Sequence, residues 1–415
     1  MRKVDKMKRI CIFWDSPFAA HDLDRIVSRL AESGENTFQI IAPNHVRTYP
    51  NVCVPLAALM DWYKSRGYDF KCKFLGTNNY VGHTCLNNPL QVENMMGSAD
   101  LLFPLDKVWK YNSAEGESAL VTAIVNAVRE NIEVEKGIIS SIEWCLNEVM
   151  DNVLQHSVSG IGYVMGQVHK EKKRVSLCVF DMGIGIYGSL KQSKHCPRTP
   201  LDGLTMALQE KITRDENVGQ GNGMWGLKRI IDENGGNLTI ESNSAMFRCM
   251  GENVETKGVR RYKAGDFANA TLVDFQLDIS NSVDIAQALN GHEPLDFWLE
   301  GHEIEDSLYF SLQKDSVGTG TRIAAQKLKN QIFNSLKEGS RKVILDFEGV
   351  NVVSSSFADE LIGKIIAERG FLYFMYNFEL KNVSPFNMSV INRSVEQRMA
   401  QKYYDNTLPD VDDNK

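Results

Sequence analysis

Hydrophobic and polar residues follow one another in patterns that divide the chain into three regions. From residue 9 to about residue 103, short apolar runs alternate with two stretches of helical spacing, at 23–33 and 54–67. The second stretch ends at Gly67 with cations in its last turn, as expected for the C-terminus of a helix. Strands that alternate with helices in this way predict a small α/β domain.

The middle region predicts a longer mixed α/β domain. Apolar residues recur at i, i+3 and i+4 over 117–132 and 137–157, which indicates two amphipathic helices. Four later segments are rich in apolar and β-branched residues and are expected to form strands, at 163–169, 174–181, 237–242 and 270–279.

The last region predicts a third α/β domain. A strand over 341–350 precedes a helix over 354–370, and the chain ends in an acidic tail. The polar segment 280–294 contains Gly and Pro and is the best candidate for a linker. The predicted fold is therefore of the α/β class, with a small domain at 1–105, a central domain at 106–280, a linker at 281–302, a C-terminal domain at 303–403 and a tail at 404–415.

Composition narrows the class of protein without naming a chemistry. Of 415 residues, 43% are hydrophobic and 24% are charged, as in ordinary globular domains. The charge balance of 46 − 53 = −7 argues against a dedicated binder of nucleic acid or of anionic membranes. The eight cysteines include no C-x-x-C pair, no apolar stretch approaches ~18 residues, and the start lacks the apolar core of a signal peptide. We expect a cytoplasmic protein with reduced thiols and no nucleic-acid or membrane partner.

Three polar residues are spaced four apart on the second predicted helix of the central domain. Glu148, Asn152 and His156 would lie along one side of that helix. A carboxylate beside a carboxamide can polarise a water or a hydroxyl group while the amide oxygen binds Mg²⁺. Taken alone, the same residues fit a solvated helix face, and His156 fits a buried, hydrogen-bonded histidine equally well.

An acidic residue and two glycines follow the strand predicted at 174–181. In Asp181-Met-Gly183-Ile-Gly185 the carboxylate can accept a hydrogen bond from an exocyclic amine. The glycines allow the backbone to approach a planar ring and to adopt positive φ. A plain turn after a strand is the simpler interpretation of this motif alone.

A glycine-rich loop leads into a predicted helix. Gly219, Gly221, Gly223 and Gly226 precede or open the segment LKRIIDEN, so that backbone N–H groups and a helix N-terminus can face phosphate. The loop is neither a P-loop nor a dinucleotide fingerprint, and a flexible linker is the alternative. Thr271, near the start of the last predicted strand, could meet an adenine edge.

In this order, the four motifs resemble the GHKL ATPase family, which includes DNA gyrase, histidine kinases and anti-sigma serine kinases. The resemblance covers about 105–280 and implies an α+β sandwich that binds ATP and Mg²⁺. It implies that Glu148 is the general base, that Asn152 binds Mg²⁺ and that Asp181 reads adenine in a pocket shaped by Gly183 and Gly185. The glycines of the loop would hold the phosphates beneath a lid at about 190–222. The predicted helix from 117 contains no His, so the phosphoacceptor helix of a sensor histidine kinase is not expected.

The C-terminal region resembles the STAS-like domains related to anti-anti-sigma factors. The match runs from Thr319 through the segment 343–350 to the serines that open the next helix. The resemblance makes Ser356, with Ser355 beside it, the phosphoacceptor-like position, although Ser354 and Phe357 depart from the usual pattern. Capping of the helix by Ser356 is the alternative. Residues 1–105 are a fainter, degenerate STAS-like candidate.

Two functions follow from these resemblances. The first is an Mg-ATP-dependent serine kinase or ATPase that is controlled by, or acts on, its STAS-like domain. The second is a nucleotide-gated interaction switch with little turnover, of the kind that would suit stress response or phage defence. A protein partner of the STAS-like domain and a homodimer are further expectations.

Overall fold

The computed structural model describes residues 8–44, 46–76, 79–156, 160–210, 212, 223–251, 253–291, 301–304, 306–339 and 342–407. The chain forms two compact units. The large unit comprises Met1–Val128 and Gly137–Glu293, and the small unit comprises Arg129–Lys136 and Pro294–Lys415. The division of the chain into five parts proposed from the sequence stays a prediction.

The N-terminal part of the large unit is a three-stranded parallel sheet with two main helices. Its elements are β1 (Lys8–Ile10), α1 (Ala19–Glu32), β2 (Thr37–Ala42), α2 (Pro50–Lys64) and β3 (Asp69–Phe74), with strand order β1-β2-β3. Helix α2 opens with Pro50, a residue that suits the first turn because no helical N–H is lost there. The alternation predicted for this region is confirmed.

An eight-stranded sheet forms the middle of the large unit, in the order β10-β9-β8-β11-β7-β6-β5-β4. Only β4 and β5 pair in parallel; the other neighbours are antiparallel. The strands are β4 (Leu90–Gln91), β5 (Trp109–Tyr111), β6 (Gly162–His169), β7 (Arg174–Asp181), β8 (Asn237–Ser242), β9 (Ala245–Met250), β10 (Asn253–Gly258) and β11 (Thr271–Asp278). The four predicted strands are confirmed as β6, β7, β8 and β11, while β9 and β10 were not predicted.

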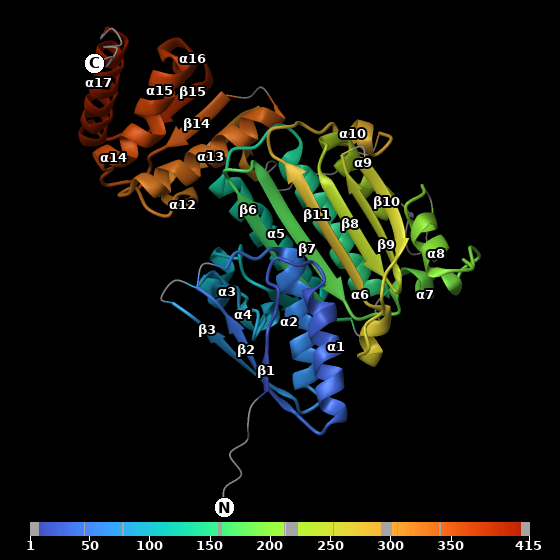
Figure 1. Ribbon diagram of the computed structural model, residues 1–415. Coiled ribbons are helices and arrows are strands. Elements are labelled where there is room, and N and C mark those ends of the chain that lie inside the picture. Colours follow the sequence, from blue (N-terminus) through green and yellow to red (C-terminus); the bar gives the residue numbers. More distant parts are fainter. Residues whose placement is uncertain are drawn as a thin grey trace, which may run out of the picture. The chain divides into compact units, whose positions relative to one another are not determined.

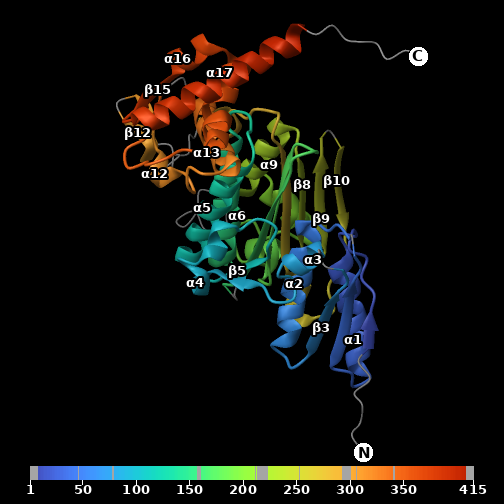
Figure 2. The same cartoon turned by 90° about the vertical axis from the view of Figure 1, so that its left-hand side faces the viewer.

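Different helices cover the two faces of this sheet. Helices α5 (Ala114–Asn131), α6 (Ile138–His156) and α9 (Gly223–Asn234) belong to one face, and α2 packs on the other face over β6 and β7 (Figures 1 and 2). Residues of β7 point alternately to the two faces. Leu177 points to the face covered by α5, where it lies near Gly166 of β6 and Ile124 of α5, and Phe180 points to the face covered by α2. The two predicted amphipathic helices are confirmed as α5 and α6.

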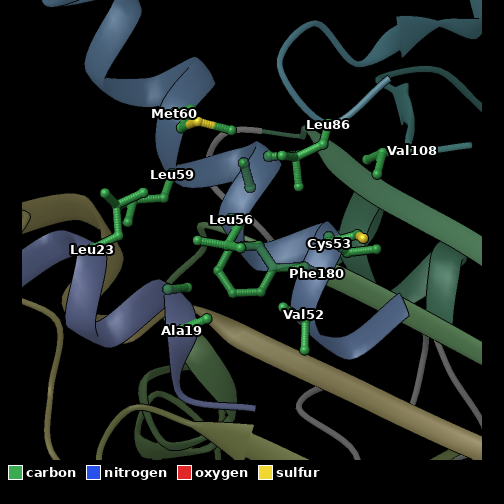
Figure 3. Close-up of a cluster of buried hydrophobic side chains, with 14 of the residues drawn as sticks. Ala19, Leu23, Val52, Cys53, Leu56, Leu59, Met60, Leu86, Val108 and Phe180 are labelled. Atoms are coloured by element: carbon green, nitrogen blue, oxygen red, sulfur yellow. The ribbon is translucent and has the colours of Figure 1, made fainter. Parts of the chain in front are cut away.

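One hydrophobic cluster joins the N-terminal elements to the eight-stranded sheet. Phe180 of β7 lies among residues of α1 and α2 that include Ala19, Leu23 and Leu56, all at most 2% exposed (Figure 3). Full burial of a Leu or Phe side chain contributes roughly 1.5–3 kcal/mol. The N-terminal region is therefore an integral cover of the sheet.

Short helices complete the large unit. They are α3 (Tyr80–His83), α4 (Val92–Met95), the 3₁₀ turn η1 (Ala99–Leu102), α7 (Gly185–Lys191), α8 (Pro200–Ala207), the 3₁₀ turn η2 (Gly265–Asn269) and α10 (Ile285–Ala288). In α10, Ala288 is buried and a neighbouring residue, Leu289, packs close to α9.

The small unit is a four-stranded sheet with helices around it. The strand order is β12 (Glu303–Ile304), β13 (Ser307–Ser311), β14 (Lys342–Asp346), β15 (Phe378–Lys381), and the last three strands are parallel. The helices are α12 (Leu312–Asp315), α13 (Arg322–Glu338), α14 (Ser355–Ala358), the π turn η3 (Asp359–Gly363), α15 (Lys364–Arg369), α16 (Phe371–Asn377) and α17 (Pro385–Thr407). The helix predicted over 354–370 is thus a helix with one π turn in its middle.

Across the described ranges of the chain, we find no helix with the length and apolar character needed to cross a membrane.

Candidate functional site

Five residues form one row across the eight-stranded sheet. Pairing places Tyr111 opposite Gly162, Gly162 opposite Asp181, Asp181 opposite Thr271 and Thr271 opposite Ser242. The hydroxyl groups of Thr271 and Ser242 share a hydrogen bond of 3.0 Å. The row therefore brings a carboxyl and two hydroxyl groups together from three strands.

Asp181 is buried at the centre of this row. One carboxylate oxygen accepts a hydrogen bond from the Gly183 N–H at 2.6 Å. Burial raises the pKa of Asp181 to about 7, although the Gly183 amide and the Thr271 hydroxyl act in the opposite direction. The carboxyl is therefore poised between its neutral and ionised forms near pH 7.

The turn after Asp181 is held by the β8–β9 hairpin. Gly185 has φ +72°, and a Cβ there would lie 2.4 Å from Asn243 Oδ1. The Ile186 N–H donates to Ser242 Oγ at 2.9 Å, and the Tyr187 N–H donates to Asn243 Oδ1 at 3.1 Å. Gly185 is therefore required by both conformation and space.

A second glycine of the row makes room for an aromatic ring. A Cβ on Gly162 would lie 2.2 Å from the buried ring of Tyr111. The Tyr111 hydroxyl donates to the Met150 carbonyl of α6 at 3.2 Å. This contact links the row to the helix that carries the other predicted site residues.

On α6, Glu148 and Asn152 lie together against the start of α9. A Cβ on Gly223 would lie 2.6 Å from Glu148 Oε2 and 3.4 Å from Asn152 Nδ2. The Asn152 amide nitrogen donates to the Glu148 carbonyl at 2.6 Å, which leaves its amide oxygen as an acceptor. Burial raises the pKa of Glu148, and the charge of Asp151 raises it further.

Of the other three glycines of the predicted loop, the structure describes Gly226 alone. A Cβ on Gly226 would lie 2.3 Å from Trp144 Cη2, so this glycine allows α9 to pack closely on α6. Gly219 and Gly221 lie outside the described residues, as do parts of the predicted lid and the side chain of His156.

A further buried carboxyl lies near the site and was missed in the sequence. Burial raises the pKa of Glu117 on α5 to about 7, and the charge of Asp151 adds to the shift. In the ranges that the structure describes, no three His, Cys, Asp or Glu residues form a group that could hold a metal ion.

The serines predicted as phosphoacceptors lie at the start of α14 in the small unit. Ser355 is exposed, and Ser356 Oγ lies 3.0 Å from Ser354 Oγ. The cap predicted at Ser356 is wrong: Ser354 caps the helix and accepts from the Phe357 N–H at 3.0 Å. The helix begins one residue before Ser356, because Ser354 is the last residue with extended backbone angles.

Comparison with known proteins identifies part of the small unit. Residues 324–387 match the family described as "STAS-like domain of unknown function (DUF4325)". No curated protein matches the chain. Among solved structures, the mycobacterial sensor histidine kinase MprB is matched with 16% identity and a TM-score of 0.24, over 42% of this chain and 99% of that chain. A TM-score of that size does not establish a common fold. The chain thus contains a STAS-like domain in its C-terminal part.

Proposed function

We propose that the large unit binds Mg-ATP in the manner of the GHKL ATPases. The observation that carries the proposal is the contact of Gly223 with both Glu148 and Asn152. It joins the end of the glycine-rich loop to the two polar residues of α6. Three helices on one face of a mixed sheet are also the layers that a GHKL-type sandwich requires.

The purine would bind at the row across the sheet. In its ionised form, Asp181 can accept a hydrogen bond from an exocyclic amine, and Thr271 and Ser242 provide hydroxyl groups beside it. Gly162 and Gly185 keep the backbone free of side chains at the points where Tyr111 and Asn243 approach. The site thus combines one carboxyl group as acceptor with a closely packed wall, as expected for recognition of a planar base.

The phosphates would bind at the N-terminus of α9. This helix has 12 residues, and its first N–H groups and dipole favour negative charge. The Asn152 amide oxygen would be a ligand of Mg²⁺, which neutralises charge on the phosphates when it is bound. The other cation ligands would be phosphate oxygens and water.

Glu148 would be the general base. Its raised pKa makes the carboxylate a better proton acceptor than an exposed glutamate, and Gly223 keeps it at the end of the loop. The acceptor of the phosphoryl group would be water or a serine hydroxyl group.

The STAS-like domain would be the regulatory part of the protein. Asp359, which could repel a phosphate on the neighbouring serines, is paired with Arg398 and with Arg322. These pairs hold the pKa of Asp359 below its usual value and offset its charge at the start of the helix. A modified Ser355 or Ser356 is therefore compatible with its surroundings.

A protein partner would dock beside the same serines. Val317, Ile323 and Val352 are 82%, 70% and 57% exposed. Their segments are joined because Thr319 Oγ1 donates to the Val352 carbonyl at 2.8 Å and the Ser354 N–H donates to the Thr319 carbonyl at 3.0 Å. These exposed apolar residues suit a protein surface rather than a small charged ligand.

The experiment that tests the proposal is incubation of the purified full chain with Mg-ATP. We expect phosphate release, or transfer of phosphate to Ser355 or Ser356 detected by mass spectrometry. Glu148→Gln should lower turnover at least 100-fold and leave Mg-ADP affinity within about threefold. Binding without turnover in both proteins would favour the nucleotide-gated switch, and absence of binding in both would contradict the proposal.

A further inference from the structure

The connection between α5 and α6 belongs to the small unit. Residues Arg129–Lys136 include the last turn of α5 and the loop that leads to α6, and they pack with α13. The same helix α6 carries Glu148 and Asn152. The chain therefore leaves the large unit for eight residues and returns directly into the helix of the candidate site.

Asn334 of α13 binds three main-chain groups of this connector. Its amide nitrogen donates to the carbonyls of Arg129 at 3.0 Å and Ile132 at 2.9 Å, and its amide oxygen accepts from the Val134 N–H at 2.9 Å. Asn334 is only 3% exposed. The last carbonyls of an α-helix have no partner within the helix, and here a side chain from α13 supplies one.

Neighbouring residues of α13 extend the same contact. Asn330 donates to the Glu130 carbonyl at 2.9 Å, and Lys327 pairs with the Glu130 carboxylate at 2.9 Å. Lys337 donates to the Val134 carbonyl at 2.9 Å and pairs with Glu133 and Glu135, at 3.1 and 3.0 Å. Buried amide groups without partners are costly, so this polar face of α13 requires the connector to remain in place.

The residue after the connector cannot absorb a displacement easily. Gly137 has φ +78°, and a Cβ there would lie 1.9 Å from the Val283 carbonyl oxygen of the large unit. Ser141 Oγ donates back to the Gly137 carbonyl at 2.5 Å, within the first turns of α6. A shift of the connector would therefore move the start of α6, because the backbone at Gly137 has little freedom to compensate for it.

We propose that the small unit, which contains the STAS-like domain, sets the geometry of Glu148 and Asn152 through this connector, with Asn334 as the positioning residue. An event that moves α13, such as docking of a protein partner, would alter its hydrogen bonds to residues 129–136. The position of α6, which follows these residues directly, would then change as well. The expected effect of this coupling on nucleotide affinity rests on the proposed function. The expected effect on the structure of α6 does not, because it requires no ligand.

The experiment compares Asn334→Ala with Asn387→Ala in the full chain. Asn387 is a matched control: it is buried in the small unit, donates to the Val350 carbonyl and accepts from the Val353 N–H, both at 3.0 Å, and lies outside the connector contact. Hydrogen exchange is followed over 129–136 and over 138–152 without nucleotide, and Mg-ADP affinity is then measured by calorimetry.

We expect Asn334→Ala to speed exchange at least tenfold in both segments and to weaken Mg-ADP binding at least threefold. Asn387→Ala should speed exchange around residues 350–353, where its two main-chain contacts lie, and should leave 129–136 and 138–152 unchanged. If Asn334→Ala does not fold, Lys337→Met is the second variant. It removes the contacts of Lys337 with the Val134 carbonyl, Glu133 and Glu135 but keeps those of Asn334, and it should show the same pattern at smaller amplitude. Unchanged exchange over 138–152 in a folded connector variant would overturn the proposal. If the wild-type protein binds no nucleotide, the proposed function fails and the exchange measurement alone decides the coupling.

Discussion

The backbone of Gly223 lies directly against the Glu148 carboxylate: a Cβ at Gly223 would be 2.6 Å from Oε2. The two residues are 75 positions apart in the sequence and belong to different helices, α9 and α6. A side chain at residue 223 would have to push the Glu148 carboxylate aside. The contact therefore places the end of the proposed phosphate-binding loop beside Glu148, the proposed general base.

Gly223→Ala should retain the fold and lose turnover. The atom it would meet is the end of a flexible side chain, so we expect stability to change by less than about 1 kcal/mol. Phosphate release should fall at least tenfold because Glu148 is displaced. Gly265→Ala is the control, since no atom lies within 4 Å of a Cβ at Gly265. Equal turnover in the two variants would argue against a role for the contact.

The carboxyl group of Asp181 should make stability depend on pH in a definite direction. Its pKa is raised from 3.8 to about 7 in the folded chain. Its contribution to folding is therefore most favourable below pH 3.8 and is lost as pH rises to about 7, by about 4 kcal/mol in total. Relative to the wild type, Asp181→Asn should gain stability progressively between pH 4 and pH 7. Urea denaturation of both proteins at several pH values measures the difference, and a constant difference would contradict the burial effect.

Gly162→Ala should destabilise the large unit by about 1–3 kcal/mol, because the added methyl group meets the buried ring of Tyr111 at 2.2 Å. The double variant Gly162→Ala with Tyr111→Leu should recover part of that loss relative to the sum of the single changes. Thermal unfolding of the four proteins completes the cycle. Additive effects would mean that the two side chains do not compete for the same space.

The start of α14 offers a test of which serine is structural. Ser354→Ala removes the cap and should cost about 1 kcal/mol, whereas Ser355→Ala should cost less than about 0.5 kcal/mol because Ser355 is exposed. Chemical denaturation of the small unit within the full chain measures both. A larger loss from Ser355→Ala would reverse the assignment. Only a serine that is not needed as the cap can be modified without loss of the helix.

Local patterns predicted much of the fold. Helices α5 and α6 were predictable because their apolar residues repeat at helical spacing over long stretches, and β6, β7, β8 and β11 were predictable as apolar runs. Strands β9 and β10 were missed, and β10 is exposed along its whole length, so burial imposes little pattern on it.

The candidate site was predictable only in part. Glu148, Asp181 and the glycines stand out as motifs within one segment each. Tyr111 and Ser242 join the row only through strand register, which no local pattern encodes. In the sequence, nothing distinguishes Asn334 from other polar residues on helices, because its partners lie about 200 residues earlier in the chain.

Calorimetric titration with Mg-ADP tests the nucleotide site most directly, when wild type, Asp181→Asn and Asp274→Asn are compared. Asp274 is a matched control, because it is also buried, has its pKa raised to about 7, and lies on β11 with its side chain among residues of the opposite sheet face, where Asn51 of α2 donates to it at 3.2 Å. We predict that the wild type and Asp274→Asn bind Mg-ADP with similar affinity, and that Asp181→Asn binds at least tenfold more weakly. Equal affinity in all three proteins, or no binding by the wild type, would contradict a nucleotide site at Asp181.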